Sequence, residues 1–329
     1  MNMFKIGVML CTSSLVLCLL MQFISFHTAY FATYDQAKDT PSHPSEGRTH
    51  RFERHQQRYH YVPPASNNVT GTNELCGAGP NFTTYFNLKF TERSGNNEDL
   101  DIYNLFFKDS FDSKGHGGVI ELGAFDGMRE SNSRFFEHCL GWDALLIEGN
   151  PKTYEKLVSN RPNSHRFNFA PSCSEKEDMA DKMVKFDDCP MLNASLGSVN
   201  TVCSVKNRTV DVACGSLTPV LLGVFPKGHV SFFSLDVEGS EPHVLQHIDF
   251  SKVFIEVMII EHYNDICKRH ECESRDKFRK IMDDNGCILF TRAITKSDLF
   301  IHPSSEHLQS ALKVKKLKEE HERSKNFLL

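Results

Sequence analysis

The stretch VIELGAFDGMRESNSRFFEHCLGWDALLIEGNPKTYEKL, residues 119–157, decides the fold of this chain. Two apolar runs, at 118–122 and 144–148, have the length and composition of buried β-strands. Each run leads into a stretch that suits a helix, at 130–139 and at 151–159. Two successive strand–helix units predict a parallel sheet with crossover helices.

The same alternation continues on both sides of this stretch. It predicts a leading helix at 101–111, a helix at 275–285, and strands at 164–170, 230–237, 253–260 and 286–292. We therefore expect a doubly wound, mostly parallel α/β sheet. Residues 173–214 have no clear period and contain four cysteines, so they predict an insertion tied by disulfides, with a short strand near Val210.

Composition excludes some classes of protein. The chain has 329 residues, of which 40% are hydrophobic, and a formal net charge of −5. This charge provides no basic field for phosphate backbones, so no nucleic acid partner is expected. Nine of the eleven cysteines lie beyond residue 30, and pairing in an oxidising compartment would leave at least one thiol free. The alternative is a scatter of buried free cysteines, since no Cys/His spacing typical of a metal site occurs.

The N-terminal segment predicts the compartment. Residues 6–26 carry no charge and are long enough to cross a bilayer as one helix. We interpret them as a transmembrane signal-anchor behind a cytosolic tail at 1–5, with a cleavable signal peptide as the alternative. Four N-glycosylation sequons favour a single-pass type II topology with a lumenal domain, and they begin at Asn68, Asn81, Asn193 and Asn207. The predicted location is the endoplasmic reticulum or Golgi, with the endosome or plasma membrane as alternatives.

Two further segments flank the predicted domain. Residues 27–74 contain four prolines and many polar residues without a sustained apolar period, which is typical of a flexible stem. We interpret its histidines as part of a solvated linker, with a pH sensor or a metal-binding tract as the alternative. Residues 304–329 are rich in charge and predict a solvated C-terminal tail.

The candidate ligand site follows the first two strands. Gly123 and Gly127 would let the backbone turn tightly and approach a ligand closely. Glu148 closes the second strand 25 residues after Gly123, where an acid suits the hydroxyls of a ribose. The loop does not spell GxGxxG, which disfavours a dinucleotide dehydrogenase. A purely structural turn is the alternative.

These residues closely resemble the opening of FkbM-type methyltransferase domains. The resemblance continues through DVEGSE at 236–241 and through Ile259-Ile260-Glu261, and it covers roughly residues 100–303 of a domain that we place at 75–303. It implies a class I methyltransferase-like (Rossmann-like) fold that binds S-adenosylmethionine. It also implies the cofactor-binding residues, which are Glu121, Gly123, Asp126 and Gly127 around the methionine end, Glu148 at the ribose with Asn150 beside it, and Ser172 near the adenine.

Catalysis is expected at the ends of the later strands. Methyl transfer needs alignment of donor and acceptor and, for a hydroxyl acceptor, a group that takes up a proton. Asp236, Glu241 and Glu261 are the candidates for this base. The alternative is that Asp236 or Glu241 only caps a helix or fixes the loop. No metal site is predicted, although three carboxylates could hold Mg²⁺.

Two functions remain open from the sequence. The first is an O-methyltransferase that acts on a sugar or another small hydroxyl in the secretory pathway. The second is a non-catalytic role in the trafficking of membrane-protein cargo, because the anchor, stem and domain together are also similar to the insect protein Star. Intact glycines and Glu148 favour the first, whereas a lumenal domain would need imported S-adenosylmethionine. The disulfide pairing, the oligomeric state and the acceptor are not readable from the chain.

Overall fold

The computed structural model describes residues 46–65, 73–77, 82–109, 117–187, 209–262, 269–313 and 316. The chain divides into two compact units, 1–47 and 48–329, and the second contains almost everything described here. The predicted signal-anchor and all four sequon asparagines lie outside the described residues. Within them, no helix combines the length and the apolar character that a membrane span requires.

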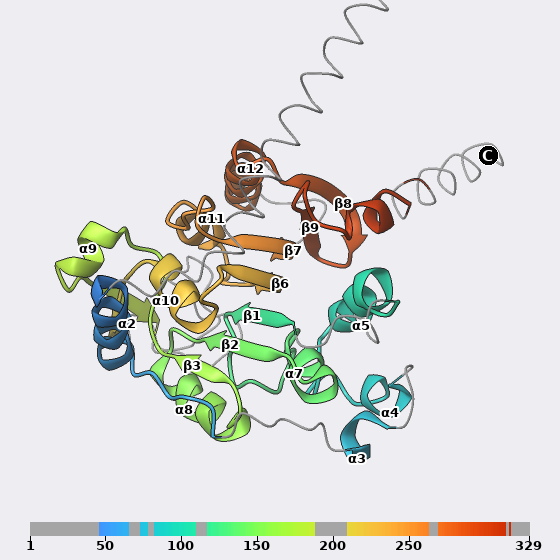
Figure 1. The fold of residues 1–329 in the computed structure, drawn as a ribbon, viewed down its shortest axis with the longest axis horizontal. Coiled ribbons are helices and arrows are strands. Elements are labelled where there is room, and N and C mark those ends of the chain that lie inside the picture. The colour runs from blue at the N-terminus through green and yellow to red at the C-terminus, as the bar shows by residue number, and fades with distance from the viewer. Residues whose placement is uncertain are drawn as a thin grey trace, which may run out of the picture. The chain divides into compact units, whose positions relative to one another are not determined.

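A seven-stranded sheet organises the second unit (Figure 1). Its strand order is β3-β2-β1-β6-β7-β9-β8, and β9 runs antiparallel to both of its neighbours. The strands are β1 (Gly118–Leu122), β2 (Asp143–Ile147), β3 (His165–Phe167), β6 (His229–Leu235), β7 (Phe254–Glu261), β8 (Ile288–Ile294) and β9 (Ser297–Ile301). The predicted doubly wound, mostly parallel sheet is confirmed.

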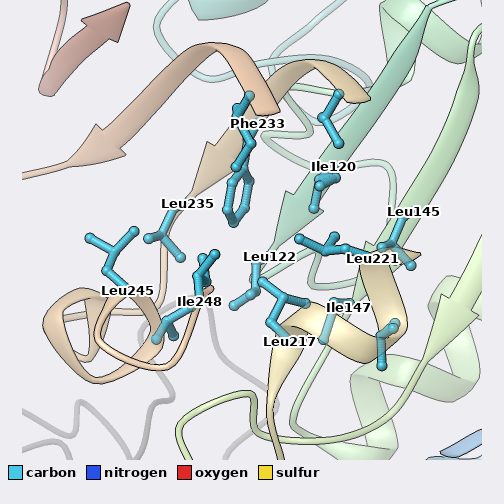
Figure 2. Packing of buried hydrophobic residues seen from close by; sticks show 14 of the residues in the cluster. Ile120, Leu122, Leu145, Ile147, Leu217, Leu221, Phe233, Leu235, Leu245 and Ile248 are labelled. Atoms are coloured by element: carbon cyan, nitrogen blue, oxygen red, sulfur yellow. The ribbon is translucent and has the colours of Figure 1, made fainter. Parts of the chain in front are cut away.

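Helices cover both faces of this sheet. The principal ones are α5 (Glu98–Ile102), which continues into the π-helix η1 (Tyr103–Phe107), α7 (Arg134–Leu140), α8 (Pro151–Asn160), α10 (Leu217–Val224), α11 (Glu241–Leu245) and α12 (Arg269–Asp284). One apolar core lies between the sheet and α10, α11 and α12. Figure 2 shows the part of this core against α10 and α11. The second lies on the opposite face, against α5, η1, α7 and α8. Alternating side chains of the strands supply both cores, as expected of a sheet buried on both sides.

Local sequence explains where the first two units begin and end. The side chain of Asn150 accepts a hydrogen bond from the backbone N–H of Lys152, and Pro151 occupies the first turn, so helix α8 begins directly after β2. Gly141 ends α7 with a φ of 69°, a conformation that glycine adopts without strain. The predicted helices at 130–139 and 151–159 are therefore confirmed, the first with a later start.

The structure describes the two ends of the predicted cysteine-bearing insertion. The short helix α9 (Glu175–Met179) leads into a hairpin in which β4 (Met183–Asp187) pairs antiparallel with β5 (Thr209–Ala213). A disulfide between Cys173 and Cys214 closes this insertion at its base. A second disulfide joins Cys76 to Cys139, while Cys287 is free.

Part of the predicted flexible stem is folded, which corrects our expectation for residues 46–62. Helix α2 (Glu46–Arg58) presents Phe52, His55 and Tyr59 on one face at positions i, i+3 and i+7. Tyr59 is fully buried in the core under α10, and Phe52 packs against that core. The apolar period escaped the sequence analysis because a histidine occupies its middle position.

The same correction applies to the start of the predicted C-terminal tail. His307 and Ala311 are buried, and Ala311 belongs to the core on the α7 face of the sheet. The domain thus extends beyond residue 303, and it also begins before residue 75. Both predicted boundaries were set too far inward because the buried positions are few and widely spaced.

Buried Asp178 fastens helix α2 to the insertion. Its carboxylate accepts hydrogen bonds from His55 Nε2 at 2.6 Å and from the Tyr59 hydroxyl at 2.6 Å. It also pairs with Arg54 and Arg58. Burial alone would raise the pKa of this carboxyl. The hydrogen bonds from His55 and Tyr59 and the nearby cations outweigh burial, and the pKa falls to about 2.

Replacement of Asp178 by Asn is expected to lower the free energy of unfolding by about 2 kcal/mol, because a buried acceptor for charged donors loses its charge. Urea denaturation of the full chain measures this change. The control is Asp181→Asn, which removes a carboxylate that also pairs with Arg54 but is 74% exposed. It should cost less than about 1 kcal/mol. Equal effects of the two substitutions would contradict the role of Asp178.

Candidate active site

The sheet brings four predicted residues into one row. Four strands are in register at their carboxyl ends. Leu122 of β1 pairs with Ile147 of β2 and with Leu235 of β6, and Leu235 pairs with Ile260 of β7. The residues that follow them therefore lie side by side at the carboxyl edge of the sheet, and they are Glu148, Gly123, Asp236 and Glu261. Strand order reverses between β1 and β6, and ligands of open parallel sheets bind at such a point.

Gly123 allows the strands to stay close at this point. Its φ is +86°, and a Cβ atom on it would lie only 1.7 Å from the backbone oxygen of Asp236. The glycine is thus required by the neighbouring strand β6. Gly127, with a φ of +76°, is required by packing, since its Cβ would lie 2.6 Å from side-chain carbons of Leu157 and Arg161.

Glu148 fixes the loop after β1. Its Oε2 accepts a hydrogen bond from the Phe125 backbone N–H at 2.8 Å, and its Oε1 accepts one from Asn150 at 2.7 Å. The Thr153 side chain also forms a hydrogen bond with this carboxylate, which still leaves it able to accept one from a ligand hydroxyl. Burial raises the pKa of this carboxyl to about 7, although the two backbone hydrogen bonds favour its charged form.

Other predicted cofactor residues serve the turns around this loop. Asp126 Oδ1 accepts hydrogen bonds from the backbone N–H groups of Met128 and Arg129, both at 2.9 Å. Asn150 caps helix α8. Ser172 lies apart from these residues, with its hydroxyl 3.4 Å from the Cys214 sulfur.

Glu121 lies one step deeper in β1, where it is 5% exposed. Its carboxylate accepts hydrogen bonds from Ser131, Ser133 and the backbone of Asn132 at 2.6–2.7 Å. Burial raises its pKa, and the charge of Arg161 partly offsets this. In this structure Glu121 therefore shapes the 131–133 loop, and a direct contact with a cofactor would require these hydrogen bonds to change.

A group of acids lies at the ends of β6 and β7. Burial raises the pKa of Asp236 and of Glu261, and the Asp236 charge raises that of Glu261 further. Glu241 accepts hydrogen bonds from the backbone N–H groups of Val237 and Gly239, at 3.2 and 3.0 Å. This matches the alternative in which it fixes the loop, and burial raises its pKa to about 7.

Three residues of the site were missed in the sequence. Asn168 Nδ2 donates to the backbone oxygens of Glu148 and Gly149, at 2.7 and 2.9 Å. Asn132 Nδ2 donates to Ser234 at 3.0 Å and so links the loop to β6. Arg161 is fully buried behind the loop. An asparagine directly after a strand is a recognisable signal, whereas an arginine at the end of a helix gives none.

The sequence profile of the methyltransferase FkbM domain matches residues 121–288, just over half of the chain. The chain belongs to this family. It is accordingly an S-adenosylmethionine-dependent methyltransferase, and its sheet has the class I methyltransferase arrangement. The donor set fits this cofactor, since Glu148 is a buried acid directly after β2 that can still accept a hydrogen bond from a ribose hydroxyl.

Solved structures with a similar fold share little sequence with the chain. They include fibrillarin of Aeropyrum pernix with bound S-adenosyl-L-methionine (11% identity, TM-score 0.31, covering 57% of this chain and 66% of fibrillarin). A TehB-like methyltransferase of Corynebacterium glutamicum has 8% identity and a TM-score of 0.30, with 63% and 87% covered. Precorrin-6y C5,15-methyltransferase of Geobacter metallireducens has 11% identity and a TM-score of 0.32, with 62% and 86% covered. No curated protein matches the chain significantly.

Proposed function

We propose that this methyltransferase is anchored in a membrane of the secretory pathway and methylates a hydroxyl of a sugar or a similar acceptor. The observation that carries the proposal is the row formed by Glu148, Gly123, Asp236 and Glu261, which places cofactor-binding and acid groups side by side. The disulfides Cys76–Cys139 and Cys173–Cys214 support an oxidising compartment. The predicted anchor and sequons point to the same compartment.

The residues of this row would have different roles in the reaction. S-adenosylmethionine, when bound, supplies a methyl group on a positively charged sulfur. Glu148 would accept hydrogen bonds from the ribose hydroxyls, and Asn168 holds the backbone on which Glu148 lies. Gly123 lets the loop after β1 pack directly against the backbone oxygen of Asp236, so Glu148 and Asp236 stay close to the same part of the sheet edge.

The acids of β6 and β7 would receive the acceptor. Asp236 and Glu261 would accept hydrogen bonds from its hydroxyl groups and so orient one oxygen toward the methyl carbon. Glu241 would take up the hydroxyl proton at Oε2, because the hydrogen bonds from Val237 and Gly239 both go to Oε1 and its pKa of about 7 lies close to neutral pH. The new bond joins this oxygen to the methyl carbon as the bond between carbon and sulfur breaks.

Calorimetric titration of the full chain with S-adenosylmethionine and with its demethylated product tests the cofactor site. We expect binding by the wild type and a loss of about 1.5–3 kcal/mol, roughly 10- to 150-fold, in Glu148→Gln. Glu155→Gln changes an exposed residue of helix α8 and is the control. Unchanged binding in Glu148→Gln would refute the placement of the ribose.

The same titration should depend on pH. Ionised Glu148 accepts hydrogen bonds more strongly, so wild-type affinity should rise as the pH increases through about 7. Its folded pKa exceeds the ordinary value of 4.5, so the free energy of unfolding should fall as the pH rises from about 4.5 to about 7. In Glu148→Gln the affinity trend should disappear, and the fall in stability should become smaller because Glu241 still contributes to it.

Activity is then tested by incubating the full chain with the cofactor and a panel of hydroxyl acceptors. Product with a methylated oxygen supports the proposal. A well-folded, glycosylated chain that binds no cofactor would instead favour the trafficking role, and a search for membrane-protein cargo would replace the acceptor screen.

A further inference from the structure

We propose that Asp236, Glu238 and Glu261 hold one divalent cation, Mg²⁺ or Mn²⁺, and that this ion binds the hydroxyl groups of the acceptor. The inference rests on the proposed function for the identity of the acceptor, but not for the binding of the ion. The proposed ion requires an acceptor with two neighbouring oxygen atoms that can chelate a metal, such as a vicinal diol of a sugar.

Geometry places the three carboxylates around one point. One oxygen atom from each lies within 4.8 Å of the others. The register of β6 and β7 sets Asp236 and Glu261 side by side on the same face of the sheet. Glu238 follows two residues later, where the chain turns with a φ of +55°. This left-handed conformation is strained for a residue with a side chain, and such strain is common at functional sites.

A buried oxygen of Asp236 gives an independent reason for a ligand. Its Oδ1 atom is shielded from solvent and has no hydrogen-bond partner. Such an unpartnered acceptor costs free energy, and a cation would satisfy it. Lys296 supplies one positive charge that acts on Asp236 and Glu238, against three carboxylates in the group.

Neighbouring acids differ in this respect. Glu121, Glu148 and Glu241 lie at the same edge of the sheet, and each accepts hydrogen bonds from the protein through its carboxylate. These hydrogen bonds hold loops in place, whereas Asp236 accepts a backbone hydrogen bond from Glu238 and keeps Oδ1 without a partner. The carboxylates of Asp236, Glu238 and Glu261 form the part of the edge that is arranged for a positive partner.

The ligand chemistry indicates which ion binds. Three carboxylate oxygens are hard ligands, which suit Mg²⁺ and Mn²⁺ and disfavour soft metals. Mg²⁺ usually takes only a few protein ligands and leaves its other positions to water or substrate oxygens. Two of these positions are enough for the two oxygens of a chelating acceptor.

The ion would assist the methyl transfer without being consumed or changing its oxidation state. A hydroxyl bound to the cation loses its proton more readily, and that proton passes to Glu241. The acceptor oxygen then bonds to the methyl carbon, and the electron pair of the carbon–sulfur bond remains on sulfur. The products are a methyl ether, S-adenosylhomocysteine and one proton on Glu241.

To test the site, the full chain is first freed of metal with EDTA and dialysis. It is then titrated with Mn²⁺, and electron paramagnetic resonance measures the bound ion. We expect one bound ion per chain, which Mg²⁺ displaces. Glu238→Gln should weaken Mn²⁺ binding by at least about 10-fold. Because Glu238 is only half-buried, this variant is expected to fold. Asp236→Asn and Glu261→Gln should weaken binding at least as much.

The matched control is Glu306→Gln. Glu306 belongs to a second group that could hold an ion, together with Glu256 and His307, at the opposite end of the strands. This variant should bind Mn²⁺ like the wild type. The proposal is overturned if no ion binds at millimolar concentration, if Glu238→Gln binds normally, or if Glu306→Gln abolishes binding.

The outcome for the ion can be separated from that for the proposed function. Cofactor binding measured in the presence of EDTA shows whether each variant is folded and has its cofactor site. Metal-independent methylation of a hydroxyl would overturn the ion alone. Mn²⁺ binding without methylation of any hydroxyl would overturn the proposed acceptor class and leave the ion site intact.

Discussion

Replacement of Gly123 by alanine is expected to lower the free energy of unfolding by about 4 kcal/mol or more. The new Cβ would lie 1.7 Å from the backbone oxygen of Asp236, a distance that no side-chain movement can relieve. Strand β6 would have to move away from β1, and the hydrogen bond from Asp236 N to Leu122 O would be lost. The same movement would separate Glu148 from Asp236, so cofactor binding should be lost as well.

Gly286→Ala is the matched control for this substitution. Gly286 also has a positive φ, of +76°, but a Cβ on it would have no atom within 4 Å. Backbone strain alone should cost about 1–2 kcal/mol there. Urea denaturation of the two variants thus separates strain from the clash with β6. If both lose the same stability, the contact between Gly123 and Asp236 does not hold the strands in place.

The sequence predicted the central sheet because its strands are continuous apolar runs separated by helices. β1 was predicted with the bounds that it has, and β2, β6 and β7 within two residues. Strand β9 was missed. It follows β8 after only two residues, so the pair reads as one segment. Helix α2 was missed because His55, which is buried only through its bond to Asp178, interrupts the apolar face.

The candidate site was predictable in its outline, because residues that follow parallel strands meet at one edge. This rule brings Glu148, Gly123, Asp236 and Glu261 together without any knowledge of side chains. It could not distinguish an acid that faces a ligand from one that holds a loop. Local hydrogen bonds occupy both carboxylate oxygens of Glu121, whereas the backbone N–H groups of Val237 and Gly239 bind only Oε1 of Glu241.

Arg161→Met is expected to lower the free energy of unfolding by about 3–5 kcal/mol, because it leaves a buried carboxylate without its partner. Arg161 is fully buried and pairs with Glu137, which is 1% exposed. Its guanidinium also donates to the Gly127 backbone oxygen at 3.1 Å, and to Ser131 and Ser133 at 3.1 and 3.2 Å. These two serines hold Glu121, so the variant should also loosen the loop and weaken cofactor binding.

The pair also predicts a dependence on acid. Burial raises the pKa of Glu137, but the charge of Arg161, together with His138 and two side-chain hydrogen bonds, lowers it below the ordinary value of 4.5. Because the folded pKa is lower than 4.5, ionised Glu137 stabilises the protein above pH 4.5. This stabilisation is lost as the pH falls from 4.5 through the folded pKa. Arg161→Met should remove this loss, which urea denaturation between pH 3 and pH 7 measures.

Arg51→Met is the control, because Arg51 and its partner Glu175 are 40% and 42% exposed, and it should cost less than about 1 kcal/mol. The decisive variant combines Arg161→Met with Glu137→Met. Much of the cost of the single change comes from the unpaired buried charge, so the double variant should recover part of the lost stability. It should not recover cofactor binding, because the hydrogen bonds from Arg161 to Gly127, Ser131 and Ser133 remain absent. Recovery of both would mean that the arginine only neutralises Glu137 and does not position the loop.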